Sequence, residues 1–316
     1  AKRGAKAALE QSEAYRQAVQ TQLIATIANS YYSLLMLDAQ LDISERTAAI
    51  WGENVRAMKA LKAAGDATEL AVAQSEASKL SVDASIASLR QQIDQMENTL
   101  TALLGIAPQK IDRTTIGEQR FPTELAAGVP LQLLQRRPDV RQSEAALAQA
   151  FYATNAARAA FYPSITLSGS AGWTNAAGAA ITNPGQWLFT AVGSLVQPLF
   201  NRGKNIANLR IAKAQQEEAL LSFRQSLLDA GTDVNNALIQ WQTARQRQQI
   251  DQQQILSLES TVRSSELLMQ YSSQNYLEVL TARQTLLQAE LTAVSDRFDE
   301  IQGVINLYHA LGGGAE

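Results

Sequence analysis

The stretch FYPSITLSGSAGW, residues 161–173, lies between two stretches that are typical of long helices, yet its periodicity is wrong for a helix. From Ile165 to Trp173, apolar or small residues at odd positions alternate with Thr, Ser and Gly at even positions. Strict alternation over about ten residues is typical of a strand with one apolar and one polar face. Such a strand is unexpected in a chain rich in Ala, Leu and Gln, and it decides the interpretation of the whole sequence.

The composition limits the class of protein. The chain has 316 residues, of which 46% are hydrophobic and only 6% aromatic, and its formal net charge is −3. This charge provides no basic surface for nucleic acid. Cysteine is absent, which excludes disulfides, thiolate catalysis and Cys-based zinc sites. The sequence contains no run of about 18 apolar residues that would cross a membrane as a helix.

A long helical hairpin is predicted before the strand. Over residues 7–64, apolar residues recur every three or four positions without an interrupting proline, which favours a left-handed coiled coil. A helix of roughly 57 residues is on the order of 85 Å long. Gly65 is expected to end it, and Asp66 with Glu69 has capping-box spacing for a return helix that ends near Leu104.

A second long hairpin follows the strands and repeats the first with an offset of 207 residues. The offset pairs RGAKA (3–7) with RIAKA (210–214) and aligns Val72 with Val279. It preserves both ends, the turn and the heptad register. An internal duplication of this size is typical of a stacked or barrel-like architecture. Two unrelated coiled coils are the alternative interpretation.

These patterns divide the chain into five segments. We expect a first helical hairpin, an irregular segment, a helix that leads to the strands, a strand hairpin with a loop at 175–186, and a second helical hairpin. The predicted ranges are 1–105, 106–137, 138–162, 163–200 and 201–316.

Aromatic residues at the strand ends favour a membrane location. Tyr162 and Trp173 flank the first strand, and the eleven residue steps between them project to roughly 28 Å at a tilt near 40°, about the thickness of a bilayer. Because unpaired strand edges are not tolerated in lipid, a spanning hairpin requires an oligomer. The predicted lipid-facing side chains are Ile165, Leu167, Trp173, Trp187 and Phe189.

A soluble hairpin that docks its apolar face on the helices is the alternative. The return strand alternates less cleanly than the first, because Leu188, Val192 and Val196 fall on the polar side. The alternation alone therefore leaves both interpretations open.

Three segments together resemble a known family. LQLLQRRPDVRQSEAALAQAFYATNAARAAFYPSITLSG (131–169), QPLFNRG (197–203) and YLEVLTARQTLLQAE (276–290) are similar to the TolC-like outer membrane factors, in particular the OprM-like efflux branch. The resemblance implies a mainly α fold in which long antiparallel coiled-coil hairpins form an α-barrel, joined to two strands of a transmembrane β-barrel.

The resemblance also implies a function and partners. It implies a homotrimer in the outer membrane of a Gram-negative bacterium that extends into the periplasm and serves as a passive exit duct for drugs or other small toxic compounds. The implied partners are a periplasmic adaptor (membrane fusion protein), an inner-membrane pump of the resistance–nodulation–division type, and outer membrane lipid. Neither a cofactor, a metal ion nor a nucleic acid is expected, and no motif typical of an enzyme is present.

The chain departs from the family pattern at its start. In the family each repeat begins with its own strand pair and a preceding helix, whereas here the first repeat starts at Ala1 with its long helix. We therefore expect roughly the first third of a family protomer to be absent, so that three such chains would contribute only half of the barrel strands.

The resemblance places a periplasmic constriction just after the second hairpin turn, at Glu278, with Thr281 where a second acidic residue is often found. A ring of glutamates from three subunits would favour cations, and untwisting of the helical tips would open it. The alternative is that Glu278 only completes a helix cap with Asn275. The tips expected to contact the adaptor are Gly65, Asp66, Ala67, Thr68, Ser272, Ser273, Gln274 and Asn275.

Other polar residues are expected to be structural. The arginines of RRPDVR (136–141) should pin the irregular segment to acidic neighbours, and His309, the only histidine, lacks candidate co-ligands. Asp229 and Asp233 share a helix face and are expected to be solvated. Two other functions fit parts of the sequence: a helical pore-forming toxin with a β-tongue, and a structural coiled-coil scaffold.

Overall fold

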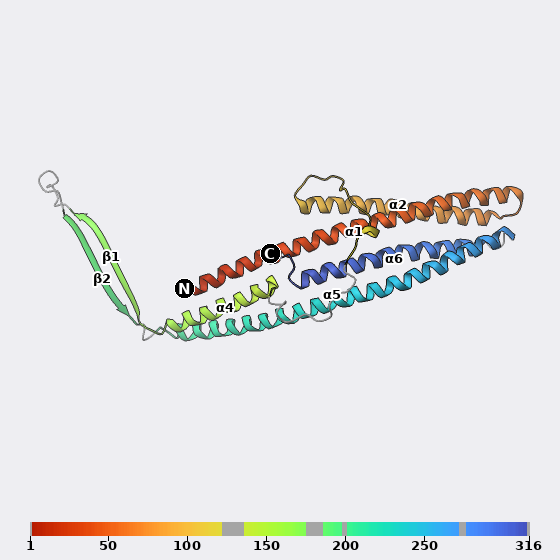
Figure 1. Cartoon of the computed structure of the whole chain (residues 1–316). Helices are drawn as coiled ribbons and strands as arrows, with labels where there is room; N and C mark the ends of the chain where they lie inside the picture. The colour runs from red at the N-terminus through yellow and green to blue at the C-terminus, as the bar shows by residue number, and fades with distance from the viewer. Residues whose placement is uncertain (1, 122–135, 175–185, 198–200, 272–275, 315–316) are drawn as a thin grey trace, which may run out of the picture. The chain divides into compact units, whose positions relative to one another are not determined.

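The computed structural model describes residues 2–121, 136–174, 186–197, 201–271 and 276–314 (Figure 1). Long helices and one antiparallel strand pair make up these residues, so the predicted fold class is confirmed. The elements are α1 (Lys2–Ala64), α2 (Glu69–Leu104), the 3-10 helix η1 (Ile116–Glu118), α4 (Pro138–Ala159), β1 (Ser164–Thr174), β2 (Gln186–Val196), α5 (Lys204–Tyr271) and α6 (Tyr276–Ala310).

The chain forms two compact units. One comprises residues 1–15 and 139–227, and the other comprises residues 16–138 and 228–316. In the first unit α4 packs on the start of α5, where the buried Thr154 hydroxyl donates a hydrogen bond to the Ala212 carbonyl at 3.0 Å. At the end of α4, the Asn205 side-chain amide donates to the Ala160 carbonyl at 3.0 Å.

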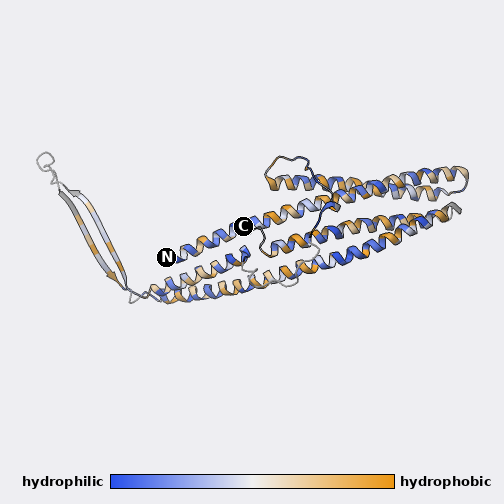
Figure 2. Ribbon diagram, in the orientation of Figure 1, coloured by the Kyte–Doolittle hydropathy of each residue, from blue (hydrophilic) through white to orange (hydrophobic). Residues whose placement is uncertain are grey.

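Two helical hairpins, α1 with α2 and α5 with α6, supply the core of the second unit. Hydrophobic and hydrophilic residues are interspersed along these helices (Figure 2), and some large hydrophobic side chains, such as Leu228 and Leu256 of α5, are exposed. In the first hairpin, Leu34, Leu37, Ile93 and Leu100 form a buried cluster that closes the seam between α1 and α2. At about 25 cal/mol per Å² of apolar surface, such a seam stabilises the pair of helices mainly by burial. None of the helices in the described ranges has a stretch long and apolar enough to cross a membrane.

The duplication is visible in the helix boundaries. The return helices begin at Glu69 and Tyr276, which are 276 − 69 = 207 residues apart. Each return helix is followed by a glycine with positive φ, Gly105 at 70° and Gly312 at 79°, again 207 residues apart. Glycine adopts this left-handed conformation without a steric penalty, so the same stop signal ends both copies.

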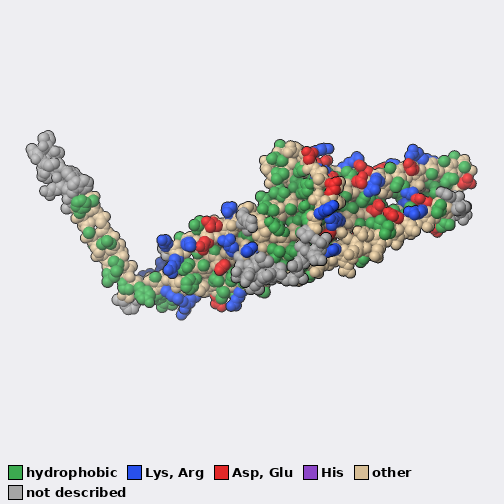
Figure 3. Space-filling model, viewed as in Figure 1, with side chains coloured by type: hydrophobic (Ala, Val, Ile, Leu, Met, Phe, Trp, Pro, Cys, Tyr) green, Lys and Arg blue, Asp and Glu red, His purple; other side chains and the backbone are tan. Residues whose placement is uncertain are grey.

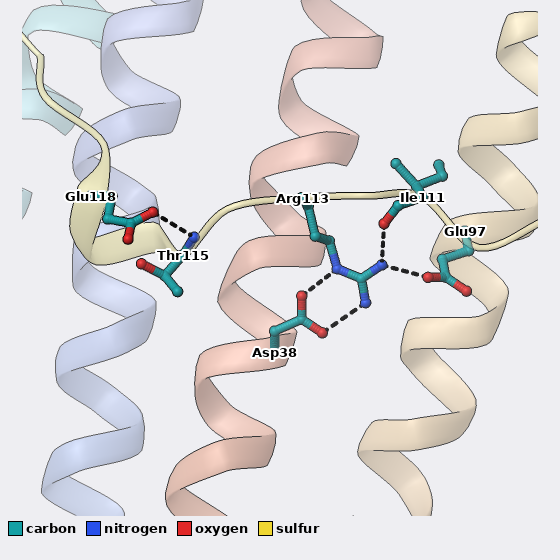
Figure 4. Close-up of polar contacts among 6 residues, drawn as sticks. All are labelled: Asp38, Glu97, Ile111, Arg113, Thr115 and Glu118. Atoms are coloured by element: carbon teal, nitrogen blue, oxygen red, sulfur yellow. Dashed lines mark hydrogen bonds and ion pairs between the residues drawn. The ribbon is translucent and has the colours of Figure 1, made fainter.

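The segment after α2 crosses the first hairpin and is held there by Arg113. The guanidinium pairs with both carboxylate oxygens of Asp38 on α1, with Nη2 to Oδ1 at 2.9 Å, and with Glu97 on α2. It also donates to the Ile111 carbonyl at 2.9 Å, so it points between the two helices (Figure 4). These contacts raise the pKa of Arg113 above its ordinary value, the hydrogen bond to Asp38 being the largest cause. Two carboxylates and one guanidinium therefore tie three segments together.

The same segment then reaches α6. Ile116 of η1 is buried with Leu35 of α1 and with Ile301 and Ile305 of α6. Beyond it, Arg297 of α6 donates to the Gln119 carbonyl at 2.7 Å. Residues 106–121 thus connect the two hairpins of the second unit through a small apolar cluster and an arginine.

Arg137 closes the second hairpin. Its guanidinium is buried and donates to the Ala310 carbonyl at the end of α6 at 3.2 Å and to Asp233 of α5 at 2.8 Å. A positive charge at a helix C-terminus is stabilising. The RRPDVR arginine at position 137 therefore pins the irregular segment as predicted. Asp233 is exposed, as predicted for a solvated residue, but the prediction did not include its ion pair with Arg137.

Candidate functional site: the strand hairpin and the helical tips

The strand hairpin has one continuous apolar face. In the antiparallel register Ile165 lies opposite Leu195, Leu167 opposite Gly193, and Trp173 opposite Trp187. Directly opposed residues point to the same side of a sheet, so the apolar residues of β1 share a face with those at odd positions of β2. The opposite face carries the Ser and Thr residues of β1 together with Val192 and Val196.

This face is open to solvent in the single chain. Ile165 and Leu167 are each 81% exposed, and Phe189 is 75% exposed. Neither strand contains a charged residue, whereas Lys, Arg, Asp and Glu are scattered over the helices (Figure 3). A hydrophobic surface of this kind marks contact with a protein partner or a membrane. The side chains of Trp173 and Trp187 and the loop residues 175–185 lie outside the described residues.

The first helical tip is a tight turn between α1 and α2. Gly65 has φ of 88°, and the amides of Gly65 and Asp66 donate to Lys62 and Leu61 of the last turn of α1 at 3.0 and 2.9 Å. The Thr68 hydroxyl accepts a hydrogen bond from the Ala71 amide at 3.2 Å and caps α2.

The sequence-based assignment of the α2 cap is therefore corrected. The spacing of Asp66 and Glu69 predicts a capping box for α2, but the Asp66 amide donates to the last turn of α1 and Thr68 is the cap. Glu69 instead pairs with Lys62 across the turn. Ala67 completes the four residues of this tip.

At the second tip, Ser272, Ser273, Gln274 and Asn275 lie outside the described residues, and the first described residue of α6 is Tyr276. Glu278 is exposed in the first turn of α6, where a negative charge complements the helix dipole. Thr281 lies one turn further on, is also exposed, and donates to the Leu277 carbonyl at 2.9 Å. Between them Val279 and Leu280 are buried, so the two predicted constriction residues face away from the packed side of α6.

Thr281 also borders a groove between α2 and α6. The groove has a volume of about 650 Å³, and hydroxyl and amide side chains from both helices line it together with apolar ones such as Trp51 and Leu291. The polar side chains include Ser78, Ser81, Ser85, Gln284, Thr285 and Gln288. Such a surface offers hydrogen bonds to water and to polar solutes.

The two tips are bound to each other through Tyr276. Its hydroxyl donates to the Gln74 side-chain oxygen of α2 at 2.7 Å, and its ring packs against the cluster of Met58, Ala71 and Val72. Burial raises the pKa of Tyr276 above its ordinary value. Local sequence spacing does not predict this contact, because Tyr276 and Gln74 are 202 residues apart. The only sequence signal for a contact at Tyr276 is the repeat. Tyr276 occupies the position of Glu69, the tip residue that pairs with Lys62 in the first copy.

Within the described part of the chain, no group of three or more His, Asp or Glu side chains could hold a metal ion. His309 lies half-buried in the last turn of α6. The arrangement as a whole is two long helical hairpins with joined tips and a hairpin of strands without charge.

Comparisons with known proteins agree with this architecture. The sequence profile described as "Outer membrane efflux protein" matches residues 1–106 and 129–313. The chain belongs to the outer membrane efflux protein family. Its location is accordingly the outer membrane, from which it extends into the periplasm.

Three relatives illustrate the similarity. The chain is 30% identical to the cation efflux system protein CusC of Escherichia coli O6:H1 over 96% of its length and 66% of that protein. It is 32% identical to the pyoverdine export outer membrane protein OpmQ of Pseudomonas aeruginosa over 99% of its length and 66% of OpmQ. A crystal structure of CusC superimposes with a TM-score of 0.90 at 29% identity, covering 99% of this chain and 74% of that one. The chain thus spans slightly less than two thirds of these curated relatives.

Proposed function

We propose that the protein is the outer membrane channel component of a tripartite efflux system. In this proposal it is a passive exit duct for drugs or other small toxic compounds, and an inner-membrane pump of the resistance–nodulation–division type supplies the energy. A homotrimer, a periplasmic adaptor and outer membrane lipid are its other partners. The observation that carries the proposal is the strand hairpin, whose uncharged strands of 11 residues each present one apolar face.

Each segment has a role in this proposal. Segments 1–105 and 201–316 line the periplasmic duct, and segment 106–137 ties the hairpins together. Segment 138–162 leads to the membrane, and segment 163–200 lies in lipid with Ile165 and its neighbours outward. The helices of 63 and 68 residues correspond to about 95–100 Å of helix, long enough for a periplasmic duct. No catalytic step is required of the protein.

The helical tips are the proposed gate. Glu278, with Thr281 one turn above it, forms the constriction, and the four residues of each tip contact the adaptor. The hydrogen bond from Tyr276 to Gln74 and the apolar cluster around Met58 hold the tips of one protomer together. Opening requires α5 and α6 to untwist away from α2, which breaks the hydrogen bond from Tyr276 to Gln74.

Conductance through planar lipid bilayers tests the proposal. We expect the purified protein to form channels that prefer cations, and Glu278→Ala to raise the single-channel conductance or weaken the cation preference, because a ring of carboxylates is removed. Absence of any channel would contradict the proposed function as a whole. An unchanged conductance and selectivity in Glu278→Ala would remove only the gate assignment.

A matched control is Glu53→Ala. Glu53 is an exposed glutamate on α1, several turns from either tip. The variant changes the net charge by the same amount, so it separates a local effect at the constriction from a general effect of charge. We expect its conductance to equal that of the unmodified protein.

A further inference from the structure

A pair of buried carboxyl groups lies in the seam of the second hairpin. Asp251 of α5 is 7% exposed and Asp296 of α6 is 1% exposed. Oδ2 of Asp251 and both carboxylate oxygens of Asp296 are buried and accept no hydrogen bond in the described structure. Arg247 forms an ion pair with Asp296, but without the geometry of a hydrogen bond. A buried carboxylate in such surroundings is unstable as an anion.

The coiled coil itself does not require these acids. With the offset of 207 residues, Asp251 corresponds to Ser44 and Asp296 to Leu89. Ser44 is equally buried in the first hairpin, where its hydroxyl donates to the Gln40 carbonyl of its own helix at 2.7 Å. Leu89 packs against the apolar cluster of that seam. The same fold therefore closes with a serine and a leucine at these positions.

Positive charge near the pair is insufficient for two anions. The charged groups that act on Asp296 are Arg247 and Asp251 from α5 and Asp299 from its own helix. Arg247 is divided between Asp296 and Asp299, the latter at 3.7 Å. Burial and the neighbouring Asp251 carboxyl group raise the pKa of Asp296 to about 6, while Arg247 lowers it. Arg247 thus pairs with two carboxyl groups, and Asp251 adds a third beside Asp296.

We propose that Asp251 and Asp296 form a proton-binding site that holds one shared proton and thereby keeps the α5/α6 seam closed. With the proton bound, the hydroxyl of one carboxyl group donates to the carboxylate of the other, and the buried pair carries a single negative charge opposite Arg247. When the proton is released to solvent, two anions face each other in the seam and repel. The site depends on the seam of one hairpin and not on the proposed channel activity.

The expected pH dependence follows from the sign of the shift. In the unfolded chain Asp296 titrates near 4, and in the folded chain near 6. Between these values the folded state holds a proton that the unfolded state has released, so stability falls as the pH rises. The stabilisation from the proton is complete below about pH 4 and is lost above about pH 6.

Thermal unfolding of the protein in detergent between about pH 4 and pH 8 tests the site through the variant Asp296→Asn. In the unmodified protein we expect a component of the pH profile in which Tm falls between pH 4 and 6, and Asp296→Asn should lack this component. Between pH 4 and pH 8 the Tm of the variant should therefore rise relative to the Tm of the unmodified protein. The matched control is Asp42→Asn on α1, where an exposed aspartate pairs with Arg46 at 3.2 Å. The Asp42→Asn variant should retain the fall in Tm between pH 4 and 6. Identical profiles for Asp296→Asn and the unmodified protein would overturn the proposal.

Infrared difference spectra of the unmodified protein provide a readout that does not depend on a variant folding. We expect the C=O stretching band of a buried protonated carboxyl group at about pH 4.5, and its loss at about pH 7.5. The double variant Asp251→Ser with Asp296→Leu, which installs the residues of the first hairpin, should lack the band at both values. A spectrum of the unmodified protein without this band would also overturn the proposal.

Discussion

The two helical hairpins share one repeat, but their seams are filled in different ways. In the first hairpin Leu34 is fully buried, and Met96 packs against the same cluster. The corresponding residues of the second hairpin are Trp241 and Gly303, and a Cβ added to Gly303 would lie 2.9 Å from the backbone N and Cα of Trp241. A larger residue on one helix is thus matched by the absence of a side chain on the other, as close packing requires.

The polarity of the seams differs as well. Leu41, Leu89 and Ile93 of the first seam belong to its apolar cluster. At the corresponding positions the second seam has Gln248, Asp296 and Glu300, and the Gln248 amide donates to the Asp296 carbonyl at 3.2 Å and to the Glu300 carboxylate at 2.8 Å. Polar side chains thus replace apolar ones at these three positions of the second seam, which elsewhere buries apolar residues such as Val234 and Ile301. The heptad pattern specifies the helical pair, whereas the chemistry of each seam is free to differ.

The largest expected effect comes from exchanging seam residues between the hairpins. Gly303→Met gives the second hairpin the residue of the first and forces a side chain against the Trp241 backbone. Because backbone atoms cannot move aside without separating the helices, we expect a loss of about 3 kcal/mol or more in the free energy of unfolding. Chemical denaturation followed by circular dichroism measures it.

The double variant Trp241→Leu with Gly303→Met completes the exchange. It should recover part of the stability lost in Gly303→Met, because Leu34 and Met96 pack in one cluster in the first hairpin. If the double variant loses more free energy of unfolding than the two single variants lose together, the two positions do not compensate each other. The comparison of side-chain volumes would then be wrong.

Each hairpin is also closed by one arginine from the irregular segment, Arg113 for the first and Arg137 for the second. Arg113→Met removes the ion-pair partner of Glu97, whose side chain is only 8% exposed. Because the site is partly open to solvent, we expect a loss of about 2 kcal/mol, less than for a fully buried pair. Denaturation of the purified variant measures it.

Adding Glu97→Gln to Arg113→Met removes the unpaired charge and should restore part of the stability. The control is Glu45→Gln, which affects an exposed pair with Arg90 and should change stability by less than about 1 kcal/mol. No recovery in the double variant would mean that Arg113 acts by packing and not through Glu97.

Sequence periodicity predicted the hairpins, the strands and the duplication, because each depends on local spacing. Contacts between distant segments were not predictable in this way, because the partner of Asp233, for example, lies 96 residues away. Periodicity also does not distinguish a polar residue that lies in a seam from one that is solvated. The α2 cap was misassigned because two helix ends compete for one short turn. The amide of Asp66 serves the end of α1, which leaves Thr68 to cap α2. The constriction at Glu278 and the adaptor contacts remain predictions.

The smallest expected effect concerns this cap and separates the two tips. Thr68→Ala removes the acceptor of the Ala71 amide and should cost about 1 kcal/mol, whereas Thr68→Ser retains the hydroxyl and should cost a few tenths of that. Hydrogen exchange should become faster in the first turn of α2 and remain unchanged in the first turn of α6, because the second tip has its own residues at these positions. Equal losses in both variants would show that the hydroxyl of Thr68 does not cap the helix. Faster exchange in α6 as well would show instead that the Tyr276–Gln74 contact transmits the disturbance, so that the two hairpins open at their tips as one unit.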